Sequence, residues 1–200
     1  MAYPSYAPVR RQRRRRWLLA ILIALIIVAI VVLAVRRTTE ARSVADYLAE
    51  AQEVAAEQAQ TADALETMLL TITDIQRPEV MRSLEELRMS SEASAETLAA
   101  TPVPAAAGEA NGYLAAAVGS WSSALEMLDD AIILVLDEPA EAGGTDQLEV
   151  SFDFLRIGDL ASAQFLEAVD GLDDSIPVGD IEVVAFTSED RAVAYDAQFV

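Results

Sequence analysis

The chain has 200 residues, a formal net charge of −19, and neither cysteine nor histidine. Without cysteine it cannot form disulfides, and without either residue it lacks the ligands of ordinary zinc sites. The same absence excludes Ser-His-Asp and Cys-His catalysis and imidazole acid–base chemistry, which leaves only paired carboxylates for an enzyme. No such pair, phosphate-binding loop or other enzyme motif stands out, so we predict a protein without catalytic activity and without a cofactor.

The N-terminal part of the chain combines a dense group of arginines with a long apolar run. The run at 17–35 contains no charged residue, and its length matches the roughly 20 residues of a helix that crosses a bilayer. Basic residues are more frequent before the run than after it, where Arg36, Arg37 and Arg42 follow, and such residues tend to stay in the cytoplasm. The residues that would fix this topology are Arg10, Arg11, Arg13, Arg14, Arg15, Arg16 and Trp17.

These features predict a single-pass cell-membrane protein with an uncleaved signal anchor. Residues 1–16 are expected in the cytoplasm, a transmembrane helix at 17–35, and the rest of the chain outside the cytoplasm. A buried core helix is rarely so uniformly apolar, and a cleaved secretory signal has a shorter apolar region with a small-x-small cleavage site. A twin-arginine export signal is a further alternative, because the sequence RRRWL at 14–18 loosely resembles one.

The remainder of the chain is strongly acidic. From Thr38 onward it contains six arginines and all 33 acidic residues, which gives a formal charge of −27. Such a charge repels nucleic acid and anionic lipid headgroups, so we predict no nucleic-acid partner. Basic protein faces, polycations and divalent ions are compatible partners, although a solvated acidic surface also explains this composition.

Beyond the apolar run, the sequence predicts a long first helix that extends to Gln76. Apolar and small residues recur there at alternating spacings of four and three, which is typical of a face that packs against other helices. These positions are Val44, Leu48, Ala51, Ala55, Gln58, Ala62, Leu65, Leu69 and Ile72. Pro78 ends this helix and suits the first turn of the next one, with Glu79 near its positive end. The second helix is expected to end before Thr101.

Two more amphipathic helices follow in the sequence. The third runs from about residue 105 or 108 to about 136, and a loop is expected at 137–144. Asp146 and Glu149 resemble a capping box that opens the fourth helix, which is expected to end at Gly171.

Four amphipathic helices joined by short loops predict an all-α fold, in which a transmembrane helix continues into an up-down four-helix bundle. We assign the bundle to residues 36–175 and a small irregular or strand-containing C-terminal tail to residues 176–200. Within the tail, residues 181–187 have the composition of a strand, and residues 191–199 resemble a short helix. A lone strand cannot form a sheet, so this segment is expected to pack on the bundle, pair with another copy or pair with a continuation of the chain.

Aromatic and acidic side chains provide candidate sites, and each has a simpler structural explanation. The acidic residues around the turn after the fourth helix do not have the spacing of a calcium-binding loop, so we expect a solvated turn. They are Asp170, Asp173, Asp174 and Asp180. Trp121 and the aromatic residues of the fourth helix could line a ligand pocket, but their helical spacing is more typical of a core. Those aromatic residues are Phe152, Phe154 and Phe165.

Two further groups of acids lie on the third and fourth helices. Asp129-Asp130 and Asp137-Glu138 close the third helix, where acids are unfavourable unless a cation or an arginine is near them. Asp153 and Asp159 lie among apolar residues of the fourth helix, on different faces, and neither has a catalytic partner evident from the sequence. We therefore assign no catalytic, cofactor-binding or metal-binding residue.

The layout resembles the extracytoplasmic four-helix bundles of bacterial receptors, with an anchor at 17–35, a helix that continues to 76 and three returning helices. The resemblance covers most of the chain but rests on architecture, without a specific motif. It departs from those receptors because a second membrane pass and a large cytoplasmic output domain are missing. The arginine bias and the sequence RRQRRRRWLL at 10–19 are also similar to those of uncharacterised single-pass membrane proteins of actinobacteria. Neither resemblance implies a site residue.

These patterns together predict a structural or protein-interaction module of the cell envelope. Its expected partners are the lipid bilayer and either an envelope protein or further copies of the chain, bound through its helices, with no specific small molecule. The alternative is a sensory module that binds a small ligand between its helices and signals through a partner protein. A pocket lined by Trp121 would favour that alternative, and a solid core there would argue against it.

Overall fold

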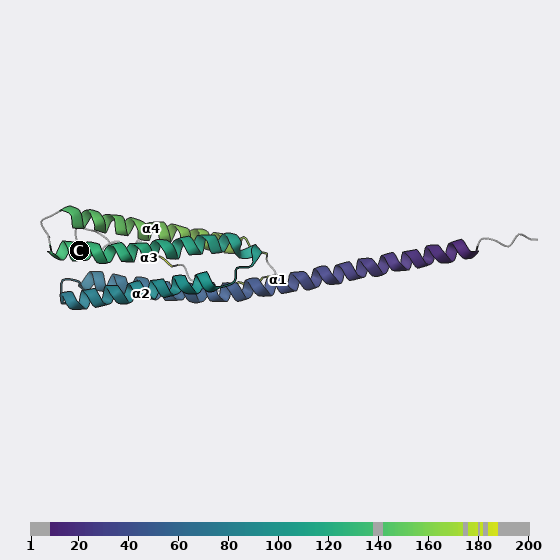
Figure 1. Ribbon diagram of the computed structural model, residues 1–200, viewed down its shortest axis with the longest axis horizontal. Coiled ribbons are helices and arrows are strands. Elements are labelled where there is room, and N and C mark those ends of the chain that lie inside the picture. Colours follow the sequence, from purple (N-terminus) through teal and green to yellow (C-terminus); the bar gives the residue numbers. More distant parts are fainter. Residues whose placement is uncertain (1–8, 138–141, 174–175, 180, 182–183, 188–200) are drawn as a thin grey trace, which may run out of the picture. The chain divides into compact units, whose positions relative to one another are not determined.

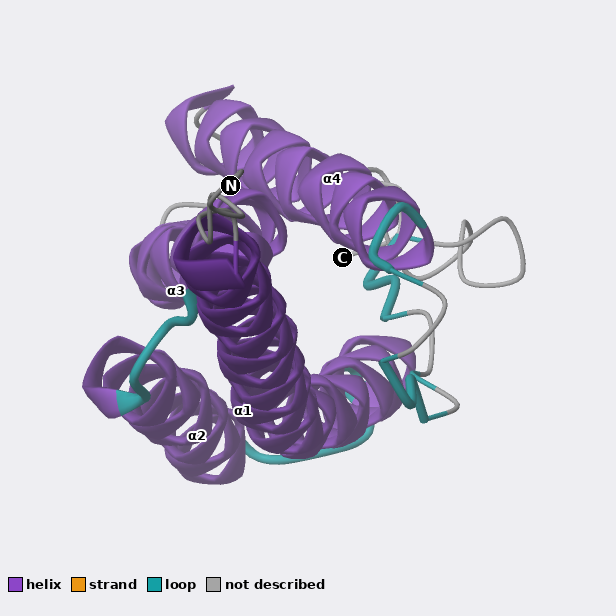
Figure 2. Ribbon diagram, turned by 90° about the vertical axis from the view of Figure 1, so that its right-hand side faces the viewer, coloured by secondary structure: helices purple, strands orange, loops and turns teal. Residues whose placement is uncertain are grey.

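The computed structural model describes residues 9–137, 142–173, 176–179, 181 and 184–187, without the side chains of residues 9–21, 23, 24, 34, 37 and 142. Its elements, in chain order, are α1 (Val9–Thr71), α2 (Arg77–Ala100), the short 3-10 helix η1 (Ala105–Ala107), α3 (Gly108–Asp137) and α4 (Ala142–Asp170) (Figure 1). Figure 2 shows helices and loops and no strand among these described residues. The all-α class and the four helices predicted from the sequence are therefore confirmed.

The chain forms two compact units, Met1–Arg42 and Ser43–Val200, and α1 contributes to both. In the first unit, the apolar run at 17–35 is one part of α1 and has helical residues on both sides. Its large apolar side chains from Leu22 to Val35, where described, are 49–61% exposed. The second unit contains the rest of α1 and the other three helices.

Within the described residues, no helix combines the length and the apolar character that are needed to cross a membrane. The transmembrane signal anchor predicted at 17–35 is therefore wrong, together with the single-pass cell-membrane location and the topology derived from it. The apolar run is not a helix of its own. The helix that contains it begins at Val9, just before the arginines, and continues through charged residues to Thr71.

Proline positions set the boundaries of α2, as the sequence predicts. Gln76 is extended and precedes the helix, and Pro78 lies in the first turn, where its missing N–H group needs no partner. At the other end, the N–H group of Thr101 donates to the carbonyl oxygens of Thr97 and Leu98. Pro102 follows directly and cannot continue the helical hydrogen bonding.

The start of α4 differs from the prediction. The sequence places a loop at 137–144 and a helix cap at Asp146, whereas the helix already begins at Ala142. Gly144 lies so close to α3 that a Cβ atom there would be 2.6 Å from Cγ2 of Val135. Glycine allows this close approach of the two helices. The contact with α3 thus favours a helical conformation that local turn propensity does not predict.

The helices of the second unit share one core. α3 packs along α4 and against α2 (Figure 1), and the Tyr47 hydroxyl of α1 donates to Oδ1 of Asn111 on α3 at 3.2 Å. Burial raises the pKa of Tyr47 to about 12. The largest fully buried side chains are Trp121, Tyr47, Phe152, Phe165, Phe186, Leu65, Leu84, Leu114, Leu125, Leu128, Ile132 and Leu148. The packing faces predicted from residue spacing therefore do form the core.

Part of the C-terminal tail also packs on the bundle, with Ile176, Val184 and Phe186 buried. Residues 181 and 184–187 form loop and bends, so the described part of 181–187 contains no strand and matches the irregular alternative instead. Backbone N–H groups that a strand would use for pairing are bound by a side chain of α4 instead. The helix predicted at 191–199 lies outside the described residues.

The core position Leu65 can be compared with an exposed leucine of the same helix. Leu65 is 0% exposed and Leu70 is 56% exposed. We expect Leu65→Ala to lower the free energy of unfolding by about 2–5 kcal/mol, because it removes buried methyl groups and leaves a cavity. The control Leu70→Ala should stay within about 0.5 kcal/mol of the parent. Urea unfolding followed by circular dichroism measures both values, and equal losses would contradict this packing.

Candidate functional site

Trp121 of α3 lies directly against α4 at Gly158. An ideal Cβ atom at Gly158 would be 2.3 Å from Nε1 of Trp121, so only glycine leaves space for the indole ring at this position. The Trp121 side chain is 0% exposed, and its ring centroid lies 5.1 Å from that of Phe186 in the tail. The indole is thus held against both α4 and the tail.

The carboxylate of Asp159, the next residue on α4, binds both of these neighbours. Its Oδ1 accepts hydrogen bonds from Nε1 of Trp121 at 3.1 Å and from the backbone N–H of Phe186 at 2.8 Å. Its Oδ2 accepts from the backbone N–H and the hydroxyl of Thr187, at 2.8 and 2.6 Å. Hydrogen bonds to an ionised carboxylate are stronger than those between neutral groups. The Asp159 side chain therefore links α4 to both α3 and the tail through hydrogen bonds.

The burial of the aromatic side chains shows whether they belong to the core or line a ligand pocket. Trp121, Phe152 and Phe165 are each at most 1% exposed, which confirms that they belong to the core. Phe154 is only partly buried. Phe186, the α4 backbone at Gly158 and the Asp159 carboxylate all lie against the Trp121 indole ring.

The role of Asp159 was not predicted from the sequence, which singled out the residue but found no partner for it. Asp153 does lie on another face, where it pairs with Arg156 at 2.6 Å. A signal was available in the sequence, because a buried tryptophan needs an acceptor for its N–H group. The Gly158-Asp159 pair in the middle of a helix offers both the space and the acceptor. The partner residues Phe186 and Thr187 could not be found, because they are distant in sequence.

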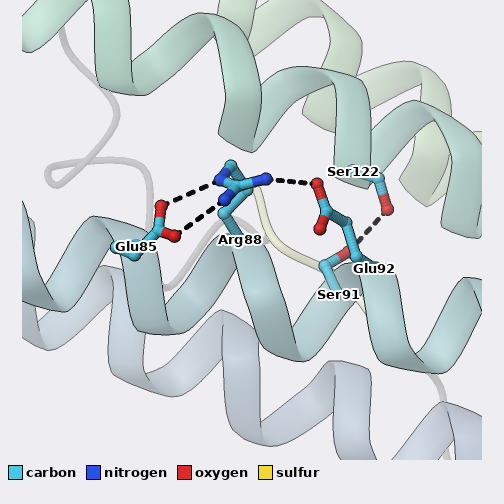
Figure 3. A network of polar contacts seen from close by, with 5 residues as sticks. All are labelled: Glu85, Arg88, Ser91, Glu92 and Ser122. Atoms are coloured by element: carbon cyan, nitrogen blue, oxygen red, sulfur yellow. Dashed lines mark hydrogen bonds and ion pairs between the residues drawn. The ribbon is translucent and has the colours of Figure 1, made fainter.

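A second polar group lies on α2 and extends to α3 (Figure 3). Arg88 donates to both oxygens of Glu85, at 3.0 and 2.8 Å, and to Glu92 at 2.5 Å. Beside it, the hydroxyl oxygens of Ser91 on α2 and Ser122 on α3 are 2.8 Å apart. The hydrogen bond from Arg88 lowers the pKa of Glu85, and the two carboxylates raise that of Arg88. These ion pairs are largely exposed and contribute modestly to stability.

Asp129 of α3 has a carboxylate oxygen whose burial is not compensated by a hydrogen bond. Its Oδ1 atom is buried and has no hydrogen-bond partner among the described residues. Burial raises the pKa of Asp129, repulsion from Asp130 and Glu85 adds to this effect, and Arg88 opposes it. The charged form of Asp129 is therefore unfavourable in the folded protein.

The negative charge of Asp137, at the end of the same helix, is compensated by a neighbouring arginine. Both of its oxygens accept hydrogen bonds from Arg77 of α2, with Nη2 and Oδ2 3.0 Å apart. The hydrogen bond from Arg77 lowers the pKa of Asp137. Of the two partners considered from the sequence, a cation or an arginine, Asp137 has the arginine, and Glu138 lies outside the described residues.

The other residues considered in the sequence are not brought together into a site. Asp170 is exposed, and Asp174 and Asp180 lie outside the described residues. In the part of the chain that the structure describes, no group of three or more acidic side chains could hold a metal ion. The side chains of residues 10–17, considered for membrane topology, lie outside the description.

No known protein family, curated protein or solved structure matches this chain.

The Asp159 contact can be tested by removing its oxygens. We expect Asp159→Ala to lower the free energy of unfolding by about 2–4 kcal/mol, because the indole N–H and two backbone N–H groups lose their acceptor. Hydrogen exchange at the amides of Phe186 and Thr187 should accelerate. For Asp159→Asn we expect a loss of unfolding free energy between zero and that of the alanine variant. Its amide retains one oxygen for Trp121 but presents N–H groups to Thr187. The control Asp153→Ala should cost at most about 0.5 kcal/mol, and a similar loss in both alanine variants would contradict the role of Asp159.

The raised pKa of Asp129 predicts a dependence of stability on pH. The folded protein holds this proton more tightly than the unfolded chain, so stability falls as the pH rises from the ordinary value of 3.8 through the folded pKa. We expect Asp129→Asn to raise the Tm by a few degrees at pH 7 and to have little effect at pH 3, where the carboxyl is protonated in both states. Thermal melts between these values test this. The exposed control Asp146→Asn removes the same charge, and an equal gain from it would refute the assignment.

Proposed function

We propose that the protein is a non-catalytic structural and interaction module that self-associates through residues 22–35 of α1. The observation that carries this proposal is the exposure of large apolar side chains at consecutive positions, including 25–28 and 30–33. Successive residues of an α-helix are rotated by about 100°, so four in a row extend around the helix. This part of α1 is therefore apolar on every side.

A helix with this character needs other apolar surface around it, because so much exposed apolar area is unfavourable in water. A single partner helix covers only one side, whereas several helices packed together cover all of them. The same segment of other copies has the right length and is likewise free of charge. Its many isoleucine and valine residues are well suited to packing between parallel helices, and closed assemblies of identical chains are the commonest oligomers.

The acidic part of the chain limits this association. Each copy carries a formal charge of −27 from Thr38 onward, so neighbouring copies repel one another. At 0.1 M salt this repulsion is largely screened between charges that are more than about 10 Å apart. Self-association is therefore expected to strengthen as the salt concentration rises, for electrostatic as well as hydrophobic reasons.

Small-molecule sensing, the alternative predicted from the sequence, has less support. It would need a cavity beside Trp121, where Phe186 and the α4 backbone pack against the indole ring. This packing disfavours a sensory role.

The proposal is tested with the full chain in detergent-free buffer by sedimentation equilibrium at several salt concentrations. We expect a discrete oligomer for the natural chain. A variant with Leu25, Ile26, Ile30 and Leu33 each changed to Gln should be a monomer, because its helix no longer has an apolar surface on every side.

The matched control changes four exposed apolar residues of the second unit to Gln. These are Leu70, Met89, Val150 and Leu160, and this variant should keep the oligomer. A monomeric natural chain would contradict the proposal, as would aggregates without a defined mass. Capture of single copies by detergent micelles or lipid vesicles, in preference to other copies, would contradict it as well.

A further inference from the structure

A groove of about 1150 Å³ lies between α1 and α2. It is lined by α1 from Glu57 to Thr71, by Ile75 in the turn, and by α2 from Glu79 to Ala93. It belongs to the second unit, and none of its lining residues lies in the segment 22–35 proposed for self-association. It is also separate from the contacts of Asp159 with α3 and the tail.

Short side chains explain why the two helices meet but leave this space open. Ala64 of α1 and Ser83 and Ala93 of α2 line the groove without filling it. Hydrogen bonds hold the helices together beside it, because the hydroxyl oxygens of Thr61 and Ser90 are 3.1 Å apart. Similarly, the Ser94 hydroxyl donates to Glu57 at 2.9 Å.

The groove combines an apolar floor with an acidic lining. Its apolar lining comprises Ala64 and Ala93, which are exposed, Ile75, which is partly buried, and Met68 and Leu87, which are only 5% and 7% exposed. The ionisable residues of the lining are Glu57 and Asp63 on α1 and Glu79, Arg82 and Glu86 on α2. The lining therefore contains four carboxylates and one guanidinium, and both helices contribute to its negative charge.

We infer that this groove binds a basic amphipathic helix of a partner protein. Helices commonly bind in grooves between two other helices, with apolar residues at helical spacing directed inward. Lysine and arginine suit such a site, because their aliphatic stems cover apolar surface while their charged ends reach acidic groups. From Glu57 to Thr71 the groove extends along α1 for about 21 Å at 1.5 Å per residue. A helix of roughly four turns would match that length.

Other cationic occupants fit the groove less well. A divalent ion needs several carboxylates that converge on one point, and no group of three does so among the described residues. A flexible polyamine or an unstructured basic segment would use the carboxylates but not the apolar floor. An amphipathic helix uses both features.

The binding test uses the full chain and a labelled 14-residue peptide of leucine and lysine with its leucines at helical spacing. Fluorescence anisotropy at physiological salt gives the affinity. We expect Glu79→Gln combined with Glu86→Gln to weaken binding about tenfold, because two ion pairs with the peptide are lost. The matched control, Glu96→Gln combined with Glu109→Gln, removes the same charge from exposed positions outside the groove and should change the affinity less than about twofold.

Two further measurements separate the groove from general attraction to an acidic protein. Ala64→Trp leaves the charge unchanged but fills the groove, and it should also weaken binding about tenfold while circular dichroism shows an intact fold. A peptide with the same composition and a scrambled order, without an apolar face, should bind at least about tenfold more weakly.

The inference is overturned if the control pair weakens binding as much as the groove pair, or if Ala64→Trp has no effect in a folded protein. Equal affinity for the two peptides would show that charge alone directs binding, and would overturn it too. The proposed self-association is judged from the mass of the assembly and not from peptide affinity. Either proposal can therefore fail without the other.

Discussion

Burial of apolar helix faces in one shared core is the interaction on which the second unit depends. The chain has no cysteine, so no disulfide limits the freedom of the unfolded state, and packing has to provide the stability. Buried polar groups are therefore costly unless they are paired. Gln58 and Ser91 are buried and within hydrogen-bond distance of each other, and Asp159 receives four donors. Asp129 departs from this pattern, and its pKa is raised accordingly.

Polar contacts in this bundle specify positions as well as adding stability. Asp159 is the clearest example, because it binds α3 through Trp121 and the tail through Phe186 and Thr187. A purely apolar contact there would allow the tail to shift along α4, whereas directed hydrogen bonds to two successive backbone amides fix its register. The serine and threonine contacts between α1 and α2 act in the same way. They hold the helices at a defined separation, and the groove beside them follows from that separation.

The sequence predicts local features well and distant contacts poorly. Pro78 and the segment at 101–104 mark helix boundaries because proline restricts its own residue and its neighbours. The start of α4 was misplaced because Gly143-Gly144 reads as a turn, while contact with Val135 of α3 favours a helix. The strand at 181–187 was predicted from composition, but Asp159 binds that backbone as a loop. The membrane anchor was predicted from the length and apolar character of the run at 17–35, but no described helix is long and apolar enough to cross a membrane. The groove could not be predicted, since it depends on how two helices lie side by side.

The two proposed surfaces influence each other through charge. Association through residues 22–35 concentrates acidic units that repel one another, and this repulsion weakens the assembly. A basic helix bound in the groove between α1 and α2 lowers the negative charge of each copy, so bound copies repel one another less. By thermodynamic linkage, a partner that favours assembly must itself bind more tightly to the assembled form. The separation of an apolar segment without charge from an acidic unit with a groove thus provides a physical route by which partner binding and self-association reinforce each other.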